Sequence, residues 1–192
     1  LGGGWPRGRV CSLRTEGAGS AGRTSLAVLT VSSASRRGLL CAWIDGAASL
    51  DPVSLKSAAA DTNRVLWVRG PMSFGKTMSA GEEVIRTGGF DVVVIRPPGR
   101  FRHWKRSHGG AGSRTAAWMR LSRAVERGRV VLLALDDEDG SAIPGCLTIM
   151  VGGYRVHWAG TPGVSDLLLG VGTRVATADG NAALELVSAE MI

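Results

Sequence analysis

The sequence has 192 residues, of which 44% are hydrophobic and 20% charged, so it can bury a sizeable core and is expected to form one domain. Its longest apolar runs are far below the roughly 18 residues that a membrane-spanning helix needs, and no membrane span is expected. The formal net charge of +7 favours an anionic partner. Because the chain opens with Leu-Gly-Gly-Gly and no Met, we expect it to be a fragment with truncated termini.

Short β-branched or leucine-rich runs alternate with helix-like stretches, a pattern typical of a mostly parallel sheet flanked by helices. Asp51 and Pro52 predict a helix start, because Asp caps well and Pro fits the first helical position. Helix ends are predicted just before Gly38, Gly88 and Gly128. The predicted strands are near 9–14, 39–45, 65–69, 91–95 and 129–135, and the predicted helices near 22–35, 52–60, 78–87 and 113–127.

After residue 135 the pattern changes to an acidic turn, Asp136–Asp139, followed by strand-like runs at Cys146–Val151, Tyr154–Ala159 and Thr173–Thr177. The pair Gly152-Gly153 predicts a hairpin turn between two of these runs. The predicted fold class is therefore α/β, a mostly parallel twisted sheet flanked by helices, with a C-terminal antiparallel extension.

Cys11, Cys41 and Cys146 each lie in an apolar, strand-like run. An odd number of cysteines without C-x-x-C spacing predicts buried free thiols in a reducing compartment, and hence a cytoplasmic protein. The three histidines show no metal-ligand spacing with the cysteines, so no metal site is predicted.

Two segments match a phosphate-binding loop, in which glycine-rich backbone amides and a Lys hold phosphates and a Ser or Thr holds Mg²⁺. The segment 70–77 fits the pattern literally, and its residues are Gly70, Gly75, Lys76 and Thr77. The segment 17–24 departs at one position, where Arg replaces Lys, and its residues are Gly17, Gly22, Arg23 and Thr24. We favour the segment 17–24, because it follows the opening strand and begins a long apolar helix.

Three successive segments resemble those that open the core of the RecA family: 4–10, 17–24 and Ala42–Pro52. In RecA these are a turn into the first strand, the phosphate loop, and a strand ending in Ile-Asp-Ala-Glu-His-Ala-Leu-Asp-Pro. The resemblance continues through Leu66–Ile95 and, more weakly, around Thr173–Val175, which implies a single RecA-like core domain over 1–192. In this frame the segment 70–77 lies in a connection that binds no phosphate, so its match is interpreted as coincidental.

The resemblance implies that the groups needed for RecA-type ATP hydrolysis are missing. Arg23 replaces the loop lysine, and Ala47 stands where the water-activating glutamate belongs. The strand Phe90–Ile95 should end in an acid, but Arg96 follows it, and a positive charge there opposes Mg²⁺. No catalytic residue and no cofactor are therefore predicted, and Asp45 and Asp51 are interpreted as strand-end and N-cap residues.

An acid-free stretch, residues 96–114, holds almost the whole excess of positive charge and is called the basic segment below. Cations interleaved with aromatic rings can follow phosphates and stack on bases. A solvated loop is the alternative. The RecA resemblance implies that this segment corresponds to the first DNA-binding loop. The second loop begins at the acidic Asp136–Asp139, whose charge would repel a phosphate backbone and oppose RecA-like DNA binding. The candidate residues for nucleic-acid or partner binding are Arg100, Arg102, Trp104, Lys105, Arg106 and Arg114.

The predicted helix Ser113–Arg127 has Arg120, Arg123 and Arg127 on one face and Ala117, Leu121 and Ala124 on another. We interpret it as an ordinary amphipathic helix.

A RecA-like core without RecA chemistry resembles the ImuA family, a component of the inducible mutagenesis cassette of many bacteria. This resemblance implies an SOS-associated adaptor in translesion DNA synthesis, associated with the nucleoid after DNA damage. Its implied partners are ImuB, an error-prone DnaE-type DNA polymerase and RecA itself. Two alternatives stay open: a divergent RecA-family ATPase that uses Lys76 or Arg23, and a single-stranded-DNA-binding module that uses the basic segment.

Overall fold

In the computed structural model, the described residues are 4–15, 22–99, 111–135, 143–159, 167–177 and 183–187. Their strands are β1 (Arg9–Thr15), β2 (Cys41–Asp45), β3 (Val65–Arg69), β4 (Val92–Arg96), β5 (Val131–Ala134), β6 (Leu147–Ala159), β7 (Leu167–Thr177) and β8 (Ala183–Val187). Their helices are α1 (Arg23–Arg36), α2 (Pro52–Ser57), the short 3-10 helix η1 (Thr62–Arg64), α3 (Phe74–Thr87) and α4 (Ala111–Gly128).

Within these ranges, eight strands form one sheet in the order β3-β2-β4-β5-β1-β6-β7-β8. The pairings from β3 across to β6 are all parallel, whereas β6–β7 and β7–β8 are antiparallel. Parallel neighbours need a crossover connection, and the described helices lie in those crossovers. The predicted fold class, a mostly parallel sheet with a C-terminal antiparallel extension, is confirmed.

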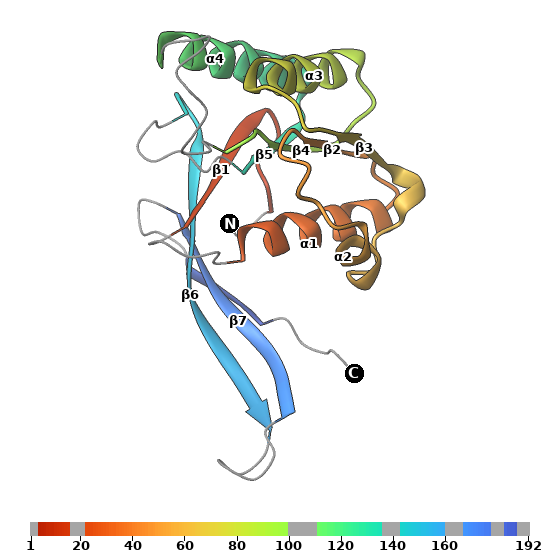
Figure 1. Ribbon diagram of the computed structural model, residues 1–192, viewed down its shortest axis with the longest axis vertical. Helices are drawn as coiled ribbons and strands as arrows, with labels where there is room; N and C mark the ends of the chain where they lie inside the picture. Colours follow the sequence, from red (N-terminus) through yellow and green to blue (C-terminus); the bar gives the residue numbers. More distant parts are fainter. Residues whose placement is uncertain are drawn as a thin grey trace.

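The sheet lies between two helical layers, with α3 and α4 on one face and α1 and α2 on the other (Figure 1). Side chains alternate along each strand and so serve both layers. Trp43, Val94 and Leu133 join the cluster that includes α1 and α2. Ile44 and Ile95 join the cluster that includes α3 and α4. Both faces of the central strands are therefore covered, as parallel sheets require.

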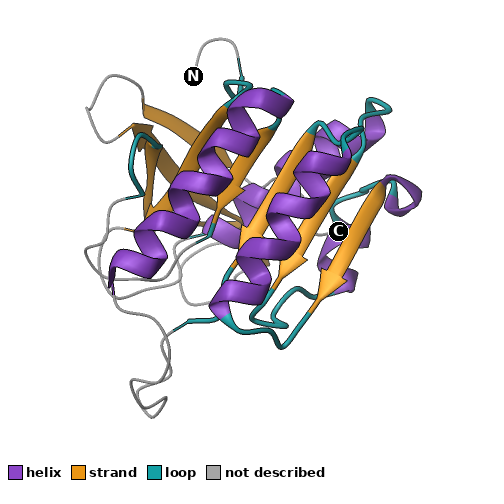
Figure 2. Ribbon diagram, turned by 90° about the horizontal axis from the view of Figure 1, so that it is seen from above, coloured by secondary structure: helices purple, strands orange, loops and turns teal. Residues whose placement is uncertain are grey.

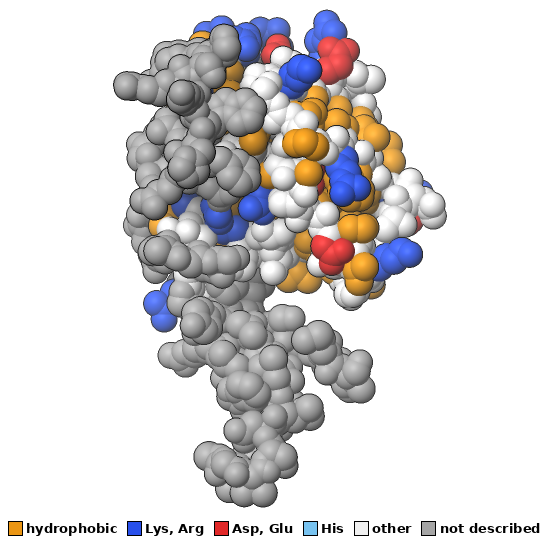
Figure 3. Space-filling view, viewed as in Figure 1, with side chains coloured by type: hydrophobic (Ala, Val, Ile, Leu, Met, Phe, Trp, Pro, Cys, Tyr) orange, Lys and Arg blue, Asp and Glu red, His pale blue; other side chains and the backbone are white. Residues whose placement is uncertain are grey.

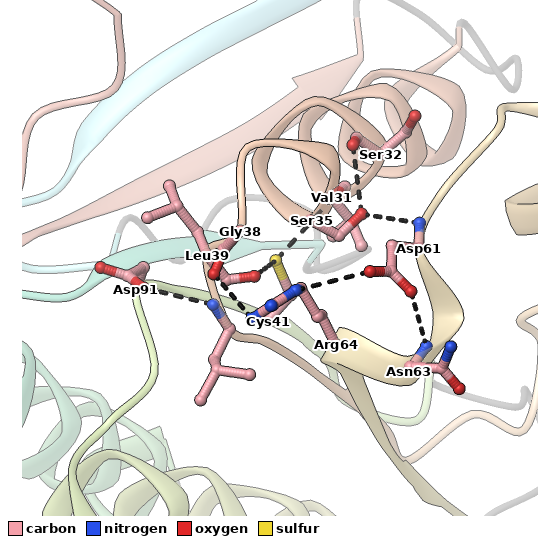
Figure 4. Close-up of polar contacts among 11 residues, drawn as sticks. Val31, Ser32, Ser35, Gly38, Leu39, Cys41, Asp61, Asn63, Arg64 and Asp91 are labelled. Carbon is pink, nitrogen blue, oxygen red and sulfur yellow. Dashed lines mark hydrogen bonds and ion pairs between the residues drawn. The ribbon is translucent and has the colours of Figure 1, made fainter.

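Polar contacts link the end of α1 to the segment that leads into β3, at the amino-terminal ends of the strands (Figure 4). The Asp61 backbone N–H donates to Ser35 Oγ at 3.1 Å, and Arg64 Nη1 donates to the Gly38 carbonyl at 2.9 Å. Directly before β2 and β4, the Leu40 N–H donates to Asp91 Oδ2 at 3.2 Å. These contacts fix one edge of the sheet and leave the opposite, carboxyl-terminal edge to carry a site.

The start predicted for α2 is confirmed, because the Asp51 carboxylate accepts hydrogen bonds from the N–H groups of Val53 and Ser54, both at 3.1 Å. The bond from the Val53 N–H, with the contacts from Ser54, lowers the pKa of Asp51. The start predicted for α3 was four residues late. Ser73 caps this helix through a 3.3 Å bond from the Lys76 N–H, so the helix begins at Phe74.

The hairpin turn predicted at Gly152-Gly153 was wrong. Strand β6 runs on to Ala159, and its pairing with β7 shifts register between Gly152 and Tyr154. A glycine pair inside a strand suits such a bulge as well as it suits a turn, because glycine tolerates the distorted backbone.

The end of α4 also differs from the prediction, because the helix includes Gly128 and the left-handed residue after it is Arg129, with a φ of 50°. Gly128 has a packing role instead. A Cβ there would lie 3.2 Å from Ile85 Cγ2, so glycine lets α4 approach α3 closely. None of the helices in the described ranges is both long and apolar enough for a membrane span.

Candidate functional site

The carboxyl-terminal edge of the sheet is the place where open α/β folds bind ligands. Three charged residues end adjacent strands there: Arg69 on β3, Asp45 on β2 and Arg96 on β4. Asp45 is in register with both arginines. Thr24, in the first turn of α1, lies against the same edge through its contact with Arg96.

Three residues of the segment 17–24 are described, and they form the start of α1. Gly22 is the N-cap residue and has a φ of 82°, the left-handed region that glycine occupies without strain. Its carbonyl accepts the Leu26 N–H at 2.8 Å, which begins the helix at Arg23. Gly17 lies outside the described residues. The described part of the segment thus shows a left-handed glycine directly before the start of a helix.

Arg96 Nη1 donates a hydrogen bond to Thr24 Oγ1 at 3.1 Å. Both side chains are half-buried. In a phosphate loop this hydroxyl binds Mg²⁺, and a carboxylate at the end of a neighbouring strand supports the metal. Here a guanidinium occupies that neighbourhood, and within the described ranges no group of three or more His, Cys, Asp and Glu residues could hold a metal. These residues do not fit Mg²⁺.

Asp45 is fully buried, and its carboxylate is used by the turn that follows β2. It accepts the Ser49 N–H at 3.1 Å and the Leu50 N–H at 2.9 Å. Ala47 lies within this turn and presents only a methyl group. Asp45 thus has the strand-end role expected of it, and the turn offers no carboxylate at position 47.

Four backbone N–H groups of the segment 70–77 donate hydrogen bonds to other groups of the protein. The N–H groups of Gly70 and Met72 donate to the carbonyls of Asp45 and Gly46, at 2.7 and 3.0 Å. Further along the segment, the Lys76 N–H donates to Ser73 Oγ at 3.3 Å and the Thr77 N–H donates to the Ser73 carbonyl at 2.9 Å. Amides that hold phosphate must point into an open loop, whereas these four donate within the protein.

Thr77 is buried and packs against Gly46. A Cβ on Gly46 would lie 2.2 Å from Thr77 Oγ1, and that hydroxyl donates to the Ser73 carbonyl at 3.0 Å. Gly75 lies in the first turn of α3, and a Cβ on it would meet nothing within 4 Å. The geometry therefore assigns Thr77 and Gly46 to packing, and Lys76 is an exposed residue of α3.

Most of the basic segment, including Arg100, Arg102, Trp104, Lys105 and Arg106, lies outside the described residues. Arg114 is described, and its guanidinium carbon lies 3.8 Å from the centre of the Phe74 ring. This cation–π contact joins α4 to the start of α3. The same Phe74 ring meets Trp118 edge to face, with ring centres 6.4 Å apart. The acidic residues 136–139 also lie outside the described ranges.

Comparison with known protein families gives a match to the RecA N-terminal domain over residues 1–98, just over half of the 192 residues. The chain belongs to the RecA N-terminal domain family. The matched region contains β1 to β4, and so includes Thr24, Ala47 and Arg96.

Curated RecA proteins are similar to this RecA-family chain over 93 residues, or 48% of its length. That of Acidothermus cellulolyticus is 39% identical, with 26% of its own length covered. The RecA proteins of Treponema denticola and Borrelia turicatae are 34% and 33% identical, with 22% and 25% of their lengths covered. The chain thus matches about a quarter of the length of these relatives.

Sequence reasoning selected Arg96 as a cation near the metal position but did not pair it with Thr24. The two residues are 72 positions apart and belong to elements that only the folded sheet brings together. Sequence reasoning also missed that Arg86 lines one hollow with the arginines of α4, because this depends on how α3 and α4 lie beside each other. The sequence held one signal for the contact between Arg96 and Thr24, namely a cation at the end of a buried strand.

Proposed function

We propose that this RecA-family chain is a non-catalytic accessory protein of DNA-damage tolerance, resembling ImuA. The observation that carries the proposal is the bond between Arg96 and Thr24. A fixed cation bonded to this hydroxyl opposes the metal that ATP hydrolysis needs. Arg23 and Ala47, at the positions of the loop lysine and the catalytic glutamate in the family resemblance, support the same conclusion.

A folded framework without catalytic groups can still act by contact, because function depends on surfaces and sites rather than on the fold. The sheet and both helical layers keep a buried apolar core. The resemblance to ImuA suggests an adaptor in SOS-induced translesion synthesis whose partners are ImuB, an error-prone DnaE-type polymerase and RecA.

Two other functions compete with this one. A divergent RecA-family ATP-binding protein in repair or recombination is favoured by the family match alone. A single-stranded-DNA-binding module is favoured by the six cations of the basic segment.

Affinity capture tests the adaptor role directly. Tagged protein is recovered from DNA-damaged cells and, separately, incubated with purified RecA and ImuB in the absence of nucleotide. We expect recovery of a translesion polymerase component or RecA without added ATP. A strict requirement for ATP and Mg²⁺ would show that the site is a working switch and would contradict the proposal.

A further inference from the structure

A hollow of about 430 Å³ lies between α3 and α4, on the outer surface of their helical layer. The two helices lie side by side over the sheet (Figure 2). Blue, basic side chains gather along this end of the molecule (Figure 3). Four arginines line the hollow: Arg86 from α3, and Arg120, Arg123 and Arg127 from α4. We call it the α3–α4 groove.

The charges in the α3–α4 groove do not balance. Glu82 lies 3.7 Å from Arg120, and Glu83, just outside the groove, lies 2.6 Å from Arg86. Each glutamate therefore neutralises one arginine. In the described part of the chain, Arg123 and Arg127 have no ion-pair partner, and both are exposed. The groove thus offers two arginines to an anionic ligand.

The groove has an aliphatic floor. Ile85 is buried and Ala124 is half-buried between the arginines, and the close approach at Gly128 brings the helix backbones together. No aromatic ring is among the described residues that line it. Bases bind such surfaces by stacking on rings, so a nucleic acid would gain only phosphate contacts here. An acidic peptide with an aliphatic side chain matches both the floor and the arginines.

We propose that the α3–α4 groove binds an acidic peptide segment of a partner protein. An aliphatic side chain of the peptide packs on Ile85 and Ala124, and its carboxylates pair with Arg123 and Arg127. This binding site would be where the proposed adaptor contacts its partner protein, so the proposal rests on the adaptor role. The groove lies near the carboxyl-terminal ends of α3 and α4. These helix ends lead into the starts of β4 and β5, whereas Arg96 is at the end of β4, so the groove and Arg96 lie at opposite edges of the sheet.

The test uses fluorescence anisotropy with purified protein and a short synthetic peptide of aspartate and glutamate with one leucine. The variant is R123A/R127A. The matched control is R36A/R37A, which removes two exposed arginines at the end of α1, on the other face of the sheet. We expect the groove variant to weaken binding by about fivefold or more and the control by less than about twofold.

Thermal unfolding checks that both variants fold, and R123Q alone, which keeps Arg127 beside the end of α4, should give an intermediate loss. A peptide without leucine should bind more weakly, and an oligothymidylate should bind no better than the leucine peptide. Three results would each overturn the proposal. The first is that the unchanged protein does not bind the peptide, and the second is that both double variants lose affinity equally. The third is that the protein prefers oligothymidylate and that R123A/R127A loses this binding. If the peptide does not bind in the groove but RecA or ImuB is still captured without nucleotide, the groove proposal is wrong and the adaptor role is not affected.

Discussion

The guanidinium of Arg96, at the end of β4, donates a 3.1 Å hydrogen bond to the hydroxyl of Thr24, in the first turn of α1. A phosphate loop uses that hydroxyl for Mg²⁺. A guanidinium has only N–H donors and offers no lone pair to a metal. The residue can attract phosphate, but it cannot serve as the acid that supports a metal.

The first prediction concerns this pair. Wild-type affinity for a fluorescent ATP analogue should not increase when Mg²⁺ is added, because the metal and Arg96 compete for one place. Arg96→Asp should create a metal ligand and make the affinity rise with Mg²⁺ by about tenfold or more. Titration of the analogue with and without Mg²⁺ measures both.

Arg69→Asp is the matched control, because it makes the same charge change at the end of β3, the next strand but one. It should not introduce a Mg²⁺ dependence. An increase of wild-type affinity with Mg²⁺ would show that Arg96 does not exclude the metal.

The second prediction tests the packing of Gly46 on Thr77. Gly46→Ala should destabilise the fold by about 1–3 kcal/mol, since its Cβ would overlap the Thr77 side chain. Adding Thr77→Ala removes the overlapping atoms, so the double variant should recover at least about 1 kcal/mol relative to the sum of the single changes. Urea unfolding of the four proteins provides the cycle.

Gly75→Ala is the control in the same segment. It should raise stability by about 0.5–1 kcal/mol, because alanine favours helix and the position is open. If Gly75→Ala instead abolished nucleotide binding, and Gly46 and Thr77 showed no coupling, the segment 70–77 would be a ligand loop.

The third prediction concerns the cysteines, which are all free thiols. Burial raises the pKa of Cys11 from 9.0 to about 12 and that of Cys41 to about 11. Cys41 lies at the contacts shown in Figure 4, whereas Cys146 is half-buried. At pH 8, a thiol reagent should therefore label Cys146 first, and Cys146→Ser should remove the fast phase. Fast labelling of Cys11 or Cys41 in the folded protein would contradict this.

The same thiols predict the sign of an alkaline effect. The folded state holds them neutral, while the unfolded chain ionises them near pH 9.0. Their contribution to stability is thus complete below pH 9 and is lost as pH rises through the raised values. Replacing Cys41 by Ser should reduce this loss in urea unfolding between pH 8 and pH 10.

The fourth prediction concerns the basic segment. The change R102A/K105A/R106A should weaken binding to single-stranded DNA or to an acidic partner without loss of fold, because it removes three of the six cations of this acid-free segment. Electrophoretic mobility and partner capture at low salt measure the two outcomes. Unchanged binding in both would reduce the segment to a solubilising loop.

The buried strands could be predicted from the sequence, because continuous apolar runs such as Val92–Ile95 are typical of a parallel sheet. The Asp51 cap was equally visible, since its partners are two and three residues away. Glycines were harder to interpret. Gly152-Gly153 lies in a bulge and Gly128 permits helix packing, and neither role differs from a turn or a helix end in local sequence.

For the candidate site, the sequence supplied the residue types and the family resemblance supplied their roles. Contacts across long separations could not be predicted. Thr77 resembles a metal-binding threonine until Gly46 is placed against it, 31 positions earlier in the chain. Likewise, the sequence pattern places Arg123 and Arg127 on an ordinary helix face. Only the structure shows that Arg86 and Ile85 line a groove with them.

The absence of ATP hydrolysis is the central claim, and phosphate release by the purified protein with ATP, Mg²⁺ and single-stranded DNA tests it most directly. We predict no turnover above the protein-free background and no stimulation by DNA, because the family resemblance implies that Arg23, Ala47 and Arg96 stand at the positions of groups that the reaction needs. DNA-stimulated phosphate release that disappears in Lys76→Ala or Arg23→Ala would contradict the account and show a working ATPase.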